Sequence, residues 1–184
     1  MEKIIDKLKE LEACDPAIKW LENYDGHAKE AWNKCERGDW MAWLISELQA
    51  DKILSYRLKY KFAALAIPYM KDERSVNAMN VLKKYIDGNA TKQELKATAA
   101  YATDAATDAD ADAPTDADAV YAAAAANAAA YATAANANAY GTYATAYATA
   151  NADAARLTTL KKIADYCRAE VSYEYLILLS NEKK

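Results

Sequence analysis

Apolar residues in the N-terminal half recur with the spacing of helices that bury one side. Ile4, Ile5, Leu8 and Leu11 fall on one stripe and predict a helix over about residues 2–12. Similar stripes predict helices that open at Asp15-Pro16, run over 27–35 and 40–48, follow Asp51 as far as Pro68, and span Val76 to Ile86. This half of the chain is therefore predicted to be a set of short amphipathic helices.

Local start and stop signals support this interpretation. Gly38-Asp39 is expected to break the chain and to supply the N-cap of the helix that starts at Trp40. Thr91 and Glu94 form a capping box, in which each side chain accepts a hydrogen bond from the other residue's backbone amide, so a new helix should begin immediately after Thr91. Gly88 is well placed to end the helix before it.

The composition changes abruptly after residue 96. Of the 59 residues from 97 to 155, 31 are Ala, and most of the others are Thr, Asp, Asn and Tyr. Alanine is the strongest helix former, so we expect helices over 92–112, 115–139 and 142–171, interrupted at Pro114 and Gly141. Alanine buries little surface, so tyrosine rings are expected to act as wedges between these helices, namely Tyr101, Tyr121, Tyr131, Tyr140, Tyr143 and Tyr147.

These patterns together predict an all-α multi-helix bundle in which short aromatic-rich N-terminal helices pack with long Ala-rich C-terminal helices. At 184 residues one helical domain over 1–184 is the simplest organisation. It comprises a Trp-rich head over 1–90, an Ala-rich tail over 91–171 and a C-terminal segment over 172–184. Large apolar residues return after Leu157, so the end of the tail is expected to dock back on the head.

Cysteine content and hydropathy indicate the compartment. Cys14, Cys35 and Cys167 are an odd number and lie far apart, which does not suggest a disulfide framework. The first residues have no signal-peptide core, and the Ala-rich stretch is interrupted too often by polar residues to cross a membrane. We expect a soluble protein of the bacterial cytoplasm with no membrane partner.

Acidic residues are concentrated in the Ala-rich block. Residues 97–155 contain seven Asp and no Lys or Arg, which argues against nucleic-acid binding because phosphates require basic side chains. An Asp ladder at i, i+4 repels itself unless a cation faces it, so this block is where we look for the surface that binds a basic protein. The candidate contact residues are Asp104, Asp108, Asp110, Asp112, Asp116 and Asp118.

No constellation in the sequence indicates catalysis. His27 is the only histidine; we interpret it as a helix-start or surface residue in preference to a catalytic base, and a single histidine argues against most histidine-based metal sites. The three cysteines include no C-x-x-C pair, and the Asp run around Pro114 lacks the glycine and the closing glutamate of a calcium loop. We expect no enzyme activity, no cofactor and no metal. The four tryptophans lie within residues 20–43 and are interpreted as core, with a ligand pocket as the alternative.

The residues around these tryptophans resemble the start of an immunity-protein family, the immunity-protein-5-like group of bacteria and bacteriophages. The resemblance rests on the order of a Trp-rich head and an Ala-rich tail with Tyr, and on these residues of the head: Ala13-Cys14, Ala17, Trp20-Leu21, Ala31-Trp32, Cys35 and the stretch Arg37 to Leu44, which contains Gly-Asp-Trp. The residues of the shared structural motif are Trp20, Trp32, Cys35, Gly38, Asp39, Trp40 and Trp43.

The resemblance implies a non-catalytic protein that neutralises a toxin or defence effector. An acidic surface suits a basic effector, because opposite charge raises the association rate. One alternative is a phage-encoded sponge that sequesters a nucleotide-like immune signal, with phosphate contacts from Arg37, Arg57 and Lys61 in the head. A second alternative is a structural helical scaffold or homo-oligomer.

Overall fold

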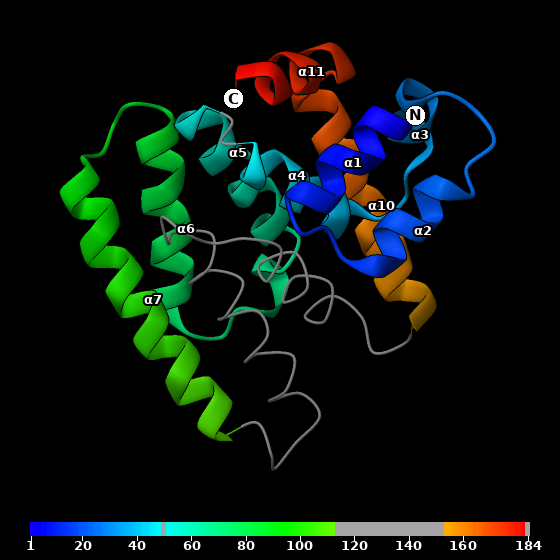
Figure 1. Cartoon of the computed structure of the whole chain (residues 1–184). Helices are drawn as coiled ribbons and strands as arrows, with labels where there is room; N and C mark the ends of the chain where they lie inside the picture. Colours follow the sequence, from blue (N-terminus) through cyan, green and yellow to red (C-terminus); the bar gives the residue numbers. More distant parts are fainter. Residues whose placement is uncertain (49–50, 113–152, 183–184) are drawn as a thin grey trace.

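The computed structural model describes residues 1–48, 51–112 and 153–182, and every regular element that these residues form is helical (Figure 1). The all-α multi-helix bundle is thus confirmed. In chain order the elements are α1 (Glu2–Glu10), α2 (Asp15–Glu22), α3 (Ala28–Lys34), α4 (Gly38–Glu47), α5 (Lys52–Ala64), the 3-10 helix η1 (Ile67–Tyr69), α6 (Glu73–Ile86), α7 (Lys92–Asp112), α10 (Asp153–Glu170) and α11 (Tyr173–Glu182). The expected helix over 115–139 and the first part of that over 142–171 lie outside the described residues.

Side-chain caps mark the starts of α5, α6 and α7. Asp51 accepts hydrogen bonds from the amides of Ile53 and Leu54, both at 3.0 Å, as expected. In the capping box before α7, the amide of Thr91 donates to the Glu94 carboxylate at 2.6 Å and the amide of Glu94 donates to the Thr91 hydroxyl at 3.2 Å, which confirms that prediction. Asp72 similarly accepts from the amide of Arg74 at 2.8 Å at the start of α6.

The expected N-cap at Asp39 is wrong. Helix α4 begins at Gly38, two residues before the expected start at Trp40, so Asp39 lies inside the first turn with only 1% of its surface exposed. Its carboxylate is bound by the guanidinium of Arg37, which occupies the N-cap position. A buried carboxylate requires a charged partner, so Asp39 pairs with Arg37 instead of capping the helix.

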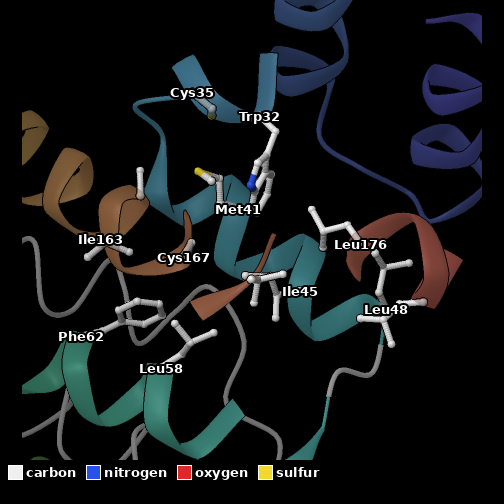
Figure 2. Close-up of a cluster of buried hydrophobic side chains, with 13 residues drawn as sticks. Trp32, Cys35, Met41, Ile45, Leu48, Leu58, Phe62, Ile163, Cys167 and Leu176 are labelled. Carbon is white, nitrogen blue, oxygen red and sulfur yellow. The ribbon is translucent and has the colours of Figure 1, made fainter. Parts of the chain in front are cut away.

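The main core lies between helices that are distant in the sequence. Figure 2 shows side chains from α3, α4, α5, α10 and α11 meeting in one cluster. Ile163 and Cys167 of α10 are fully buried there, beside Met41 and Ile45 of α4. The prediction that the chain after Leu157 docks on the N-terminal half is therefore confirmed.

A second packing layer joins α6 to α5 and α7. Met79 and Leu82 on α6 are buried together with Tyr56 of α5 and Leu95 of α7. Further along, Ala78 of α6 meets Ala102 and Ala106 of α7. Contacts between alanines let two helix backbones approach closely, which compensates for the small area that each side chain buries.

Tyr101 does not act as a wedge. Its side chain is 59% exposed on the outer face of α7, because the inner face toward α6 is occupied by alanine and has no room for a ring. The other five tyrosines expected to be wedges lie outside the described residues.

Glycine 38 sets the contact between α4 and α10. A Cβ placed on Gly38 would overlap the backbone carbonyl of Leu160 and lie 2.6 Å from the Cβ of Ile163. No other residue type fits without moving α10, because real Cβ atoms are not found so close to backbone. None of the helices that the structure describes is long and apolar enough to cross a membrane.

We expect Gly38→Ala to lower the free energy of unfolding by about 1 to 3 kcal/mol, because the added methyl group overpacks a tight contact. Urea denaturation measures this loss. Gly88 is a matched control, because nothing lies within 4 Å of its Cβ position and only its φ of +78° is restrictive. Gly88→Asn should cost much less, since Asn tolerates that conformation. Equal losses for the two variants would contradict the role assigned to Gly38.

Candidate functional site

The acidic face of α7 is only partly within the described residues. Asp104 and Asp108 are exposed on that helix. The backbones of Asp110 and Asp112 lie in its last turn, but their side chains, and Asp116 and Asp118 entirely, lie outside the part that the structure describes. Asp104 and Asp108 are therefore the two members of the predicted surface whose side chains the structure describes.

The aspartate ladder on α7 is not left to repel itself. Arg74 of α6 donates to the Asp108 carboxylate at 2.7 Å and to Asp72 at 2.7 Å. The hydrogen bond from Arg74 also lowers the pKa of Asp72. One guanidinium thus bridges two carboxylates across the α6–α7 contact. Tyr101 and Asp104 lie on the same side of α7 as Asp108, seven and four residues before it.

The Gly-Asp-Trp motif ties the start of α4 together. Arg37 donates to Asp39 through Nε at 2.9 Å and through Nη2 at 2.6 Å, a bidentate pair. The same guanidinium lies 4.2 Å from the ring centroid of Trp40. A buried carboxylate, a fork-shaped cation and an indole therefore form one stacked unit.

Arg168 of α10 binds the end of α3. Its Nη1 donates to the carbonyl oxygen of Cys35 at 2.6 Å, and its Nη2 donates to Asp165 at 2.6 Å. The first of these bonds satisfies a carbonyl at the end of α3, where the last carbonyls have no partner within the helix. Burial raises the pKa of the Cys35 and Cys167 thiols. Both therefore favour the neutral thiol, which is the weaker nucleophile and metal ligand. Within the described part of the chain no cluster of metal-ligating side chains is found.

Two of the head's cations are engaged by one carboxylate. Glu170 at the end of α10 accepts hydrogen bonds from Lys61 and, at 3.1 Å, from Arg57, both on α5. The hydrogen bond from Lys61, followed by that from Arg57, holds the pKa of Glu170 below its usual range. The three cations predicted to hold a phosphate are thus all paired with carboxylates in this structure.

The structure also contains an apolar groove, at the tryptophans for which the sequence left a ligand pocket as the alternative to core. It has a volume of about 560 Å³ and is enclosed by α1 to α4 and α11, on the side of the bundle away from α6 and α7 (Figure 1). All four tryptophans of the chain line it: Trp20, Trp32, Trp40 and Trp43. Trp32 is buried in the main core, whereas the other three are half-buried, and the rings of Trp20 and Trp40 lie 6.1 Å apart.

The tryptophans therefore serve two purposes at once. The sequence interpretation as core holds for Trp32, and the alternative of a pocket lining applies to all four. The signal available in the sequence was the concentration of four indoles within residues 20–43 beside an amphipathic first helix. The sequence could not show that these helices surround a common groove, because this depends on how the helices pack.

Comparisons of this chain with protein-family models, with curated proteins and with solved structures find no match. The geometry of the described residues thus carries the functional argument.

We expect Glu170→Gln to destabilise the protein by about 1 kcal/mol at pH 7, a value reduced for the solvent exposure of Arg57 and Lys61. Because the folded-state pKa of Glu170 is depressed, its stabilisation is present above about pH 4.5 and is lost as the pH falls through the folded-state value. The difference between variant and wild type should shrink below pH 4 in urea denaturation. The exposed Glu73→Gln serves as control, and a difference for Glu170→Gln that persists undiminished at pH 3 would contradict this account.

Proposed function

We propose that this chain is a non-catalytic binding protein that neutralises a toxin or defence effector with a basic surface. The resemblance of the Ala-Trp, Cys and Gly-Asp-Trp residues to the immunity-protein-5-like family motivates this proposal. In the structure Cys35 and Gly38 contact α10, and Asp39 is buried and paired with Arg37 at the start of α4, so these residues support the fold. The proposed binding function therefore falls on other parts of the surface.

The proposal rests on the side chains that are exposed on the outer face of α7. Tyr101, Asp104 and Asp108 lie at i, i+3 and i+7, so they share one side of the helix, and all three are exposed. An exposed tyrosine supplies contact area with little loss of conformational entropy, and adjacent carboxylates steer a basic partner toward it. Ala102 and Ala105 on the other side of α7 are fully buried, so packing against the bundle holds the helix in place.

The chemistry of the head supports binding over catalysis. The two buried thiols are held in their neutral form, and His27, the only histidine, lies exposed at the start of α3, where its backbone amide donates to Glu30 at 3.2 Å. The nucleotide-sponge alternative is less favoured, because a phosphate would have to displace Asp39 or Glu170 from the cations that it needs.

The test is a pull-down from host lysate over a salt series, followed by an activity assay of the captured protein. We expect the wild-type chain to capture a basic protein at low salt, to release it at high salt and to inhibit it. Tyr101→Ala should weaken the complex roughly 30-fold, the effect of losing a hot-spot side chain worth about 2 kcal/mol. The double variant Asp104→Asn, Asp108→Asn should mainly slow association and reduce the salt dependence.

The matched control is Asp6→Asn with Asp25→Asn, which removes the same charge from exposed positions outside α7. Unchanged capture by the α7 variants would show that this face is not the contact surface. Absence of any protein partner, together with thermal stabilisation by a cyclic nucleotide, would favour the sponge instead.

A further inference from the structure

Helix α1 has an apolar side that the rest of the protein does not fully cover. Ile4, Leu8 and Leu11 form its apolar stripe, yet α1 contains no fully buried residue. The helix packs on α2, and its stripe faces the groove. A stripe of this kind normally reaches full burial against a core, so the space beneath α1 is incompletely filled by the chain itself.

The opposite walls of the groove are also almost entirely apolar. Trp40, Trp43 and Leu44 come from α4, and Tyr173, Leu176 and Ile177 come from α11. The volume of about 560 Å³ falls within the roughly 300 to 1,000 Å³ of sites that bind small molecules. The groove is therefore large enough for a compact apolar ligand and is built from aromatic surface.

The charged side chains at the groove favour an anionic ligand. Of the described residues that line it, only two are charged, Lys3 and Lys7, and both are cations on α1. Lys7 donates to Glu10 at 2.9 Å and is partly engaged. Lys3 forms no ion pair with any of the described residues and is exposed at the edge. This local positive charge occurs in a chain whose net charge is −4.

We propose that this groove binds a small amphiphile with a single anionic head group, such as a medium-chain carboxylate. The apolar body lies between the stripe of α1 and the indoles of Trp20, Trp40 and Trp43. The head group pairs with Lys3 at the open edge, where it stays hydrated. This site is separate from the face of α7 proposed to bind an effector, so the two proposals stand or fall independently.

The test uses three ten-carbon probes with the same tail, namely decanoate, decanol and decyltrimethylammonium, each below its micelle concentration. Because every tryptophan of the chain lines the groove, intrinsic fluorescence reports directly on its occupation. We expect saturable changes with affinity in the order decanoate, decanol, decyltrimethylammonium. Lys3→Gln should weaken decanoate roughly threefold to fivefold, as loss of a solvent-exposed charge contact does, and should leave decanol unchanged.

A filling variant locates the site without weakening the fold. Ala17 lines the groove from α2, so Ala17→Leu should occupy part of the space and reduce the affinity for all three probes, with no loss of melting temperature. The exposed substitutions Ala169→Leu and Lys162→Gln on α10 are the matched controls and should bind as wild type does.

Three results would overturn the proposal. One is no saturable fluorescence change with any probe. Another is equal affinity for decanoate and decyltrimethylammonium, which would remove the role of Lys3. The third is unchanged binding by Ala17→Leu, or an equal loss in the α10 controls, which would place the probe elsewhere.

Discussion

The close approach of α4 to α10 at Gly38 is the constraint on which the packing of the head depends. It brings the start of α4 against the backbone of Leu160, and this places Asp39 where water cannot reach it. Asp39 then requires the guanidinium of Arg37, and Arg168 from α10 closes the end of α3 beside it. The same junction thus provides the close approach at Gly38, a partner for the buried charge of Asp39, and a donor for the carbonyls at the end of α3.

The two halves of the bundle use different packing chemistry. Around the junction, large side chains such as Met41, Phe62 and Ile163 interlock in the way usual for a core. Between α6 and α7 the contact becomes small on small, with alanine against alanine. The second kind of contact keeps the two helices close together and leaves polar and aromatic residues on the outside, which is why Tyr101, Asp104 and Asp108 face solvent.

Within the head, well-packed helices lie beside a helix with few buried contacts. Helices α3, α4 and α10 are joined by buried side chains and by hydrogen bonds to charged groups. Helix α1 contributes only half-buried residues and borders a groove. Binding surfaces often occur where a well-packed scaffold meets an element with few buried contacts, because that element can adjust to a ligand at little cost.

The sequence by itself determined the helical class, most helix limits and the caps at Asp51 and Thr91, because these depend on residues three or four positions apart. It also located the acidic run, since charge is a property of composition. Only the tertiary structure decided the role of Asp39, the exposure of Tyr101, the pairing of Asp108 with Arg74 and the groove beneath α1. Each of these depends on which helix faces meet. The spacing of residues along one helix does not show which distant helix packs against it.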